Sequence, residues 1–266
     1  MEIFKYILLG ILQGVSEPIP VSSSGHLYLF KEIFNTNLFD SLNFEIIANF
    51  GSFIAIFIIF YKDIVDLIQH FLKFIFSKDK ENSKSKFTYC IYVVISTIPT
   101  IITGLLFSEY FENYSIKTLG CMFLVTATML FLVRKNDGDK EDKDITLLDA
   151  IIIGLFQSVA ILPGISRSGA VLVGCLICKL KRDTALKYTF ILYFPVSLGA
   201  MILGASDLMN AQEAALLLPY TLGAISAGIV TFFSYKWLSD WVKKGKLAYF
   251  SIYCILLSLF IFIYFR

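Results

Sequence analysis

Charged residues and histidine are both scarce in this chain. Asp, Glu, Lys and Arg together make up 17% of its 266 residues, and it contains only two histidines. Soluble domains carry roughly 25% charged residues. Hydrophobic residues reach 57%, and the mean hydropathy is +0.73. These values exclude an ordinary soluble domain, and the sequence predicts an all-α integral membrane protein.

Long runs of one charge are also missing. The chain has 23 basic and 21 acidic residues, a formal net charge of +2, so we expect no nucleic acid partner. The closest cysteine pair, Cys175 and Cys178, lacks the polar or basic neighbours that a redox or metal site needs. No small-residue cleavage site follows the first apolar stretch, so we expect that stretch to belong to the mature fold.

Six windows contain the roughly 20 mostly apolar residues that a membrane-spanning helix needs. Two further apolar stretches, about 3–33 and 147–178, are interrupted near the middle by Pro, Gly and Ser. Backbone that is broken at membrane depth must be buried in protein or line a wet cavity. We therefore predict two re-entrant helical hairpins in addition to six full spans. The six windows are 44–61, 87–107, 116–133, 188–206, 217–238 and 247–265.

Lys and Arg concentrate in alternate connecting segments, which predicts the orientation. Because basic loops stay in the cytoplasm, we expect the six spans to fit only if each hairpin returns to the side it came from. The first hairpin then enters from outside, the second enters from the cytoplasm, and both termini lie outside. The basic segments are 62–86, 134–146, 179–187 and 239–246, and the segments without Lys or Arg are 34–43, 108–115 and 207–216.

The two broken stretches repeat each other. A shift of 144 residues aligns 10–26 with 154–170, and six of these 17 positions are identical without a gap. Each half would then be one hairpin followed by three spans, and an odd number of spans inverts the second half. We predict a single membrane domain, 1–266, built from two inverted repeats at approximately 1–135 and 145–266. A binding site is expected where the repeats meet.

The broken stretches also carry ionisable residues, which are costly inside a membrane and mark function. Glu17 and His26 lie in the first stretch and Arg167 lies in the second. A guanidinium beside hydroxyls and a helix N-terminus suits a phosphate group, and a serine nest opposite it could bind the same group. We predict a phosphate clamp formed by Ser22, Ser23, Ser24, Gly25, Ser166, Arg167, Ser168 and Gly169.

A carboxylate and an imidazole are more than phosphate binding requires, so the residues indicate phosphoryl hydrolysis. His26 can act as nucleophile or general base, and Ser23 can act as nucleophile if a base activates it. Glu17 can orient His26 or bind a divalent cation, Mg²⁺ or Ca²⁺, together with phosphate oxygens. Glu45 begins the first span and is interpreted equally well as a water-facing helix end or as a site residue. His70 is expected at the surface of a cytoplasmic loop.

Two segments carry a family resemblance. Residues 13–26, QGVSEPIPVSSSGH, and 163–170, PGISRSGA, resemble the two signature segments of the undecaprenyl-diphosphate phosphatase family of the bacitracin-resistance type. A third segment, 44–52, resembles another family motif. This resemblance implies a bacterial plasma-membrane enzyme with inverted repeats and re-entrant helices around a site open to the outer face. Such an enzyme removes the terminal phosphate of undecaprenyl diphosphate and so regenerates the lipid carrier for peptidoglycan synthesis.

The resemblance also implies roles for individual residues. Glu17, Ser23 and His26 match the Glu, Ser and His of the first motif, and Arg167 matches the phosphate-binding Arg. Whether the Ser or the His attacks phosphorus stays open. Gln13 stands where the family's first motif usually opens with another Glu, four residues before the one that Glu17 matches, so the site loses one carboxylate. Asn49 stands where Gln is common, and these two residues are auxiliary candidates.

Two rival functions need consideration. The phosphatidic acid phosphatase superfamily shares fragments of these motifs, but it requires a second His where this chain has Val173. A flippase that moves a polyprenyl phosphate between leaflets by alternating access would need the clamp but no nucleophile. Glu17, His26 and Arg167 together favour the enzyme. The prenyl chain length and the oligomeric state stay open, with a homodimer among the alternatives.

Overall fold

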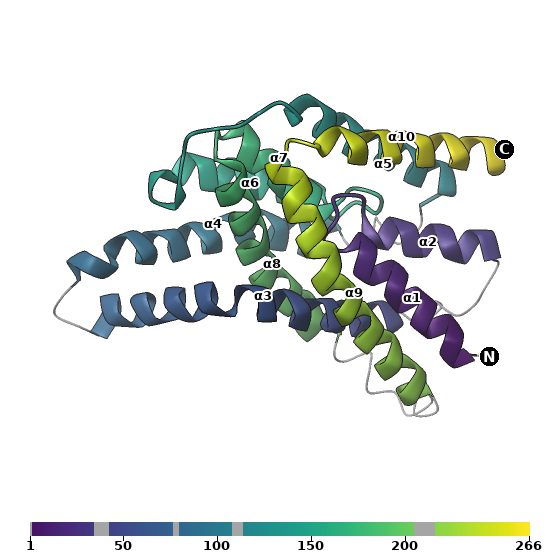
Figure 1. Cartoon of the computed structure of the whole chain (residues 1–266), viewed down its shortest axis with the longest axis horizontal. Coiled ribbons are helices and arrows are strands. Elements are labelled where there is room, and N and C mark those ends of the chain that lie inside the picture. Colours follow the sequence, from purple (N-terminus) through teal and green to yellow (C-terminus); the bar gives the residue numbers. More distant parts are fainter. Residues whose placement is uncertain (1, 35–42, 77–79, 108–113, 205–215) are drawn as a thin grey trace.

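The computed structural model describes residues 2–34, 43–76, 80–107, 114–204 and 216–266. Within these ranges the chain forms ten α-helices, which Figure 1 shows arranged around a centre where the helices cross. Their bounds are α1 Glu2–Ser16, α2 Ser23–Phe34, α3 Asn43–Phe76, α4 Lys84–Phe107, α5 Ile116–Val133, α6 Leu147–Val159, α7 Arg167–Ile177, α8 Arg182–Gly204, α9 Leu217–Lys243 and α10 Leu247–Tyr264.

Six of these helices are long and apolar enough to cross a membrane, namely α3, α4, α5, α8, α9 and α10. This confirms the predicted all-α integral membrane protein and its six spans. The shorter apolar helices α1, α6 and α7 lie in the two stretches for which we predicted hairpins. The expected outer segments 34–43, 108–115 and 207–216 lie mostly outside the described residues.

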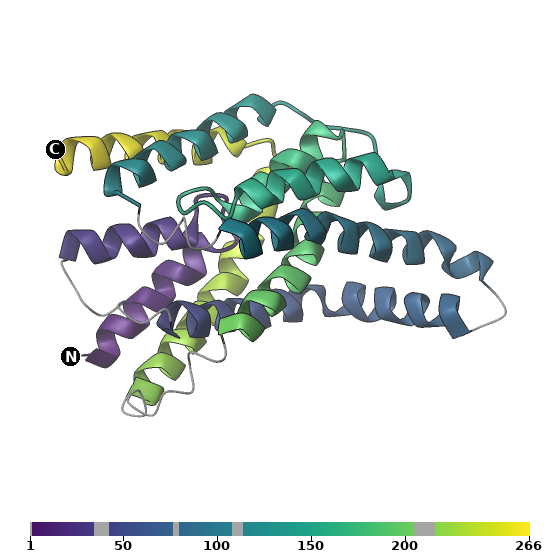
Figure 2. The ribbon, with the colours of Figure 1, turned by 180° about the vertical axis from the view of Figure 1, so that it is seen from behind.

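One predicted loop is wrong in extent. Residues 62–76, expected to be part of a basic loop, continue α3, and α4 already begins at Lys84. The helix continues because its polar end packs against α4: Lys86 Nζ lies 2.6 Å from Asp66 Oδ2, and the Phe74 and Phe87 rings stack at 4.1 Å. At about 1.5 Å per residue, α3 is roughly 50 Å long and exceeds the hydrocarbon core of a bilayer. Figure 2 shows this α3–α4 hairpin projecting from the other helices.

The same correction applies to the lone histidine of that segment. His70 lies on α3 rather than in a loop and is half-buried. Its Nδ1 lies 2.9 Å from the Asp66 carbonyl oxygen. The eighth helix also begins earlier than predicted, at Arg182 instead of 188.

Small residues allow the helices to approach closely, as is usual in membranes. At Gly51 on α3, an added Cβ would lie 2.0 Å from the Ala224 carbonyl oxygen on α9. On the α5–α10 pair, Ser258 Oγ donates to the Gly120 carbonyl at 2.8 Å, and Ser251 Oγ donates to the Ala127 carbonyl at 2.7 Å. These serines satisfy their hydroxyls on the partner backbone, so α5 and α10 lie side by side, as both views show (Figures 1 and 2).

The two halves of the chain contain the same order of elements. In each half two short helices precede three long ones: α1 and α2 before α3 to α5, and α6 and α7 before α8 to α10. The first helix of each half packs on a long helix of the other half, α1 on α9 and α6 on α4. The inversion of one half relative to the other stays a prediction.

Candidate functional site

The first broken segment makes a tight turn at Ser22. This residue has φ +69°, a left-handed conformation that is uncommon outside glycine. Its hydroxyl accepts a hydrogen bond from the Gly25 N–H at 3.3 Å, which satisfies one of the free amides at the start of α2. The turn therefore places Ser23 as the first residue of α2, with Ser24 half-buried beside it.

Glu17, just beyond the end of α1, is the centre of the site. Its side chain is only 4% exposed, and both carboxylate oxygens have partners. Ser23 Oγ donates to Oε2 at 2.5 Å, and Gln13 Nε2 donates to the same oxygen at 2.9 Å. On the other side, Arg167 Nη2 lies 3.4 Å from Oε1. Glu17 thus joins the predicted nucleophile to the predicted phosphate-binding Arg.

The second broken segment ends at the N-terminus of α7. Ser166 is the N-cap and accepts a hydrogen bond from the Gly169 N–H at 3.1 Å. Thr126 on α5 fixes this turn, because its Oγ1 accepts from the Ser166 N–H at 3.2 Å and donates to the Gly164 carbonyl at 3.0 Å. Gly164 has φ +91° and a side chain there would be strained. The turn places Arg167 as the first residue of α7.

The two turns contact each other directly. Ser168 Oγ lies 3.4 Å from the Glu17 carbonyl oxygen. A Cβ added at Gly169 would lie 3.1 Å from Pro20 Cβ, and one added at Gly25 would lie 3.1 Å from Gly164 Cα. The structure therefore brings together segments that are about 150 residues apart, and their glycines allow the close approach.

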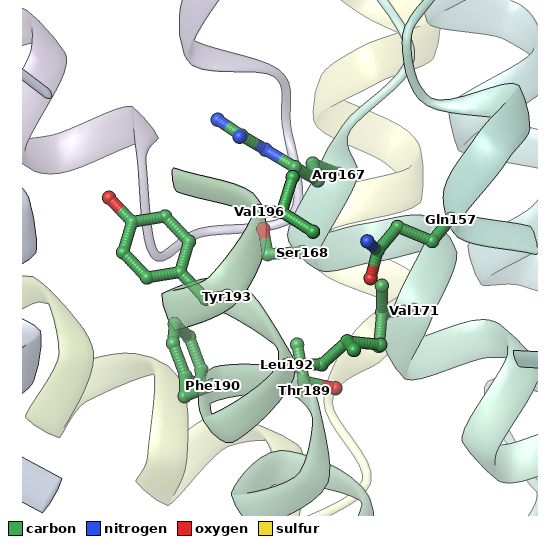
Figure 3. A pocket seen from close by; sticks show the side chains of 9 residues that line it. All are labelled: Gln157, Arg167, Ser168, Val171, Thr189, Phe190, Leu192, Tyr193 and Val196. Carbon is green, nitrogen blue, oxygen red and sulfur yellow. The ribbon is translucent and has the colours of Figure 1, made fainter. Parts of the chain in front are cut away.

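A narrow pocket lies beside Arg167, between α7 and α8. Figure 3 shows Gln157, Ser168 and Tyr193 among the side chains around it, with the Gln157 amide pointing inward. The space open to the centre of a water molecule is about 10 Å³, enough for about one water. The Arg167 guanidinium lies 5.6 Å from the centre of the Tyr193 ring, a distance at which the ring attracts the cation.

Gln13 is fully buried, and its amide orientation is fixed from two sides. Besides Glu17, its Nε2 donates to Asn49 Oδ1 at 2.6 Å, so the auxiliary candidate Asn49 contacts the site through Gln13. Among the described residues the other amide atom, Oε1, has no hydrogen-bond partner. Gln157, which aligns with Gln13 in the repeat, is also buried, and its Nε2 finds no hydrogen-bond partner within the part of the chain that the structure describes. Each half thus contributes one buried glutamine whose amide lacks one hydrogen bond to the described residues.

His26 does not join Glu17, Ser23 and Arg167. Its Nδ1 lies 2.7 Å from the Ser22 carbonyl oxygen, and its Nε2 lies 2.7 Å from the Tyr253 hydroxyl on α10. Both ring nitrogens therefore have hydrogen-bond partners, and the residue is 8% exposed. The resemblance implies a catalytic His at this position, and that role stays a prediction. The structure places the ring between the Ser22 carbonyl and the Tyr253 hydroxyl.

Glu45 lies in the first turn of α3 and is half-buried. It is close enough to Glu17 and Arg167 for their charges to interact. This placement favours the interpretation of Glu45 as a site residue over that of a water-facing helix end.

Several residues around the site escaped the sequence analysis. Thr126, Tyr193 and Tyr253 lie inside long apolar spans, where nothing in the pattern separates them from ordinary membrane-helix residues. Gln157 could have been found, since the repeat aligns it with Gln13.

This arrangement can perform phosphoryl transfer. It supplies a hydroxyl bound to a buried carboxylate, a guanidinium with its fork of donors, and the helix N-terminus of α7. Among the described residues, no three His, Cys, Asp or Glu side chains gather closely enough to hold a metal ion.

Comparison with known proteins agrees with the site. The family model described as "Bacitracin resistance protein BacA" matches residues 6–260. Undecaprenyl-diphosphatase 1 of Bacillus cereus is 40% identical over 96% of this chain and 95% of its own length. Undecaprenyl-diphosphatase 1 of Bacillus licheniformis is 42% identical over 99% and 98%, and the undecaprenyl-diphosphatase of Oceanobacillus iheyensis is 41% identical over 98% and 96%. The chain belongs to the bacitracin resistance protein BacA family.

Proposed function

We propose that this protein is a membrane phosphatase that hydrolyses undecaprenyl diphosphate to undecaprenyl phosphate and inorganic phosphate. This activity recycles the lipid carrier of cell-wall precursors and is the one for which its relatives are named. The observation that carries the proposal is the hydrogen bond from Ser23 Oγ to Glu17 Oε2, opposite the Arg167 guanidinium. The Glu17 carboxylate thus contacts both the nucleophile, for which it is the base, and the guanidinium that would bind phosphate.

In the first step Ser23 Oγ attacks the terminal phosphorus, and Glu17 Oε2 accepts the hydroxyl proton. The bond from this phosphorus to the bridging oxygen breaks, and undecaprenyl phosphate leaves as a stable anion. Such a leaving group needs charge stabilisation more than a strong general acid. The phosphoryl group stays on Ser23. Glu17 passes its proton to the departing phosphate oxygen of undecaprenyl phosphate and is again ionised. In the second step water attacks the phosphorus of this phosphoserine and Glu17 takes a water proton. The bond from phosphorus to Ser23 Oγ breaks, Glu17 returns the proton to Ser23 Oγ, and inorganic phosphate is released.

Arg167 is suited to change partners during this cycle. Its 3.4 Å separation from Glu17 Oε1 is longer than the roughly 2.7–2.9 Å of a strong charge-assisted hydrogen bond. A terminal phosphate could therefore take the guanidinium in a bidentate contact. Glu17 would lose its cationic neighbour at that moment and become a better proton acceptor for Ser23.

A divalent cation, Mg²⁺ or Ca²⁺, fits this site only with help from the substrate. The chain offers the Glu17 carboxylate and Gln13 Oε1, a buried acceptor without a partner among the described residues. Both are oxygens of the kind that hard cations bind. We propose that these two residues would hold the cation together with phosphate oxygens, where it would neutralise charge on the diphosphate.

The basic segments predict that the site opens to the outer face of the plasma membrane and that both termini lie outside. In the basic segment 62–86, the described residues Lys80, Lys84 and Lys86 lie at the projecting end of the α3–α4 hairpin. We propose that this end is cytoplasmic.

The proposal is tested by phosphate release from undecaprenyl diphosphate by the purified protein in detergent. Ser23→Ala and Arg167→Ala should each abolish release, whereas Ser85→Ala, at an exposed serine near the start of α4, should not change it. Acid-quenched wild-type protein incubated with terminally ³²P-labelled substrate should carry label, and Ser23→Ala should carry none. Full activity in Ser23→Ala would overturn the assignment of the nucleophile.

The flippase considered from the sequence would need no such nucleophile, and the Ser23–Glu17 hydrogen bond favours hydrolysis. A folded wild-type protein that binds the lipid phosphate and releases no phosphate would move the conclusion to lipid translocation.

A further inference from the structure

The His26 ring links two parts of the chain that are distant in sequence. Besides its two hydrogen bonds, it lies parallel to the Tyr253 ring at 5.6 Å and 5°, and edge-on to Phe123 at 5.5 Å. The ring is thus enclosed by α10 and α5. Tyr253 itself is 43% exposed.

The two hydrogen bonds define which nitrogen carries the proton. A backbone carbonyl can only accept, so the Nδ1 that faces the Ser22 oxygen at 2.7 Å must be protonated. In the neutral ring Nε2 then has no hydrogen and must accept from the Tyr253 hydroxyl at 2.7 Å. The order of donors is therefore Tyr253 to His26 and His26 to the Ser22 carbonyl.

That carbonyl belongs to the strained turn that starts α2. Ser22 has φ +69°, and a left-handed serine persists only where its surroundings hold it. Its carbonyl oxygen accepts both the His26 backbone N–H at 3.2 Å and the ring Nδ1. The imidazole therefore clamps the turn whose next residue, Ser23, binds Glu17.

We infer that Tyr253 is a positioning residue for Ser23, acting through His26 and the Ser22 carbonyl. In this arrangement His26 is neither nucleophile nor base but holds the turn that aims the Ser23 hydroxyl at Glu17. The inference rests on the proposed function for the role of Ser23. It gives a residue of α10 a role in the site, although α10 lies outside both sequence motifs.

The first test is spectroscopic and independent of activity. The chain has only two histidines, so a His70→Gln variant labelled with ¹⁵N-histidine gives the signal of His26 alone. We expect one neutral ring state with the proton on Nδ1. In Tyr253→Phe, which keeps the aromatic ring and removes the hydroxyl, the Nε2 resonance should move and a second ring state should appear. A proton on Nε2 in the wild-type ring would overturn the inference.

The second test compares kinetics. Tyr253→Phe should lower kcat about three- to tenfold with KM unchanged, as loss of one hydrogen bond that aligns the nucleophile would. The matched control is Tyr249→Phe, one turn earlier on α10, whose ring contacts Trp241 at 5.1 Å and should retain wild-type kinetics. An unchanged kcat in Tyr253→Phe would overturn the positioning role.

The third test separates positioning from catalysis at His26. His26→Asn keeps an N–H donor near the place of Nδ1, and His26→Gln moves the donor toward the place of Nε2. We expect Asn to retain more activity than Gln, whereas a catalytic imidazole would leave both variants equally inactive and overturn the inference. Activity in Ser23→Ala would overturn the proposed nucleophile instead, and the ring-state measurement keeps these two failures apart.

Discussion

Ser23 donates a 2.5 Å hydrogen bond to Glu17, and this contact joins the first residue of α2 to the residue that follows α1. The other oxygen of the same carboxylate faces Arg167. In the proposed mechanism Glu17 therefore has two tasks, because it accepts a proton on one side and competes with phosphate for the guanidinium on the other. The two tasks can be separated experimentally, since loss of the proton acceptor should appear in kcat and loss of the negative charge beside Arg167 should appear in KM.

Glu17→Gln should lower kcat by about 10²–10⁴, the usual contribution of a general base. The same change should lower KM, because Arg167 no longer has a carboxylate partner and is free for the diphosphate. Steady-state phosphate release and equilibrium binding of undecaprenyl phosphate give the two numbers. The double variant Ser23→Ala/Glu17→Gln should be no slower than Ser23→Ala alone, since the two groups act as a unit. Additive losses would contradict the pairing.

Arg167→Lys should lose about 10²-fold in kcat/KM even though the charge is kept. Lysine offers a point charge without the planar fork that binds two phosphate oxygens, and it would also lose the contact with the Tyr193 ring. Arg134→Lys, beyond the end of α5, is the matched control and should leave kinetics unchanged. Near-wild-type activity in Arg167→Lys would mean that the site needs only a positive charge there.

Gln13→Glu should make activity strongly dependent on a divalent cation. The new carboxylate would lie about as close to Glu17 Oε2 as the present amide, 2.9 Å, and two carboxylates this close cannot both be ionised without a cation. It would also face Asn49 Oδ1 without a hydrogen to donate. Phosphate release should fall in chelator and recover with Mg²⁺ or Ca²⁺. Equal activity with chelator and cation would exclude a cation between these residues.

How much of this site the sequence could predict depended on the residue type. Glu17 and Arg167 were identifiable because a charge within a membrane segment is costly and so marks function, and Ser23 was a candidate because it lies in the serine nest and matches the Ser of the family motif. Tyr253 was not identifiable, because its role depends on how α10 packs against α2, 227 residues away. In sequence it looks like any tyrosine of an apolar helix.

The extent of α3 was missed for a different reason. The apolar stretch ends at Lys62, but the helix continues, because the following residues keep good helical propensity and pack against α4. Apolar windows locate the part of a helix that lipid surrounds, whereas the end of the helix depends on its neighbours.

Single cysteines introduced into a variant without the five native ones should report the orientation. Ser115→Cys, at the N-cap of α5, should react with a membrane-impermeant maleimide added to intact cells. Lys80→Cys, at the far end of the α3–α4 hairpin, should react only after the membrane is opened. The reverse labelling pattern would place the basic segments outside and the site toward the cytoplasm.

Gly51→Ala should destabilise the fold where α3 crosses α9. The new Cβ would lie 2.0 Å from the Ala224 carbonyl oxygen and 2.8 Å from its carbon. These are backbone atoms that cannot rotate away, so the two helices must separate. Overpacking of this kind costs about 1–3 kcal/mol, which corresponds to a loss of roughly 4–8 °C in Tm for 2 kcal/mol.

Both tryptophans of the chain, Trp237 and Trp241, lie on α9, so intrinsic fluorescence reports the melting of this contact. Gly199→Ala on α8 is the matched control, because nothing lies within 4 Å of its added Cβ and alanine favours a helix over glycine. Its Tm should stay equal or rise slightly. If Gly51→Ala melted like Gly199→Ala, α3 and α9 would not cross as closely as the structure has them, and the position of Asn49 beside Gln13, which the same helix sets, would lose its support.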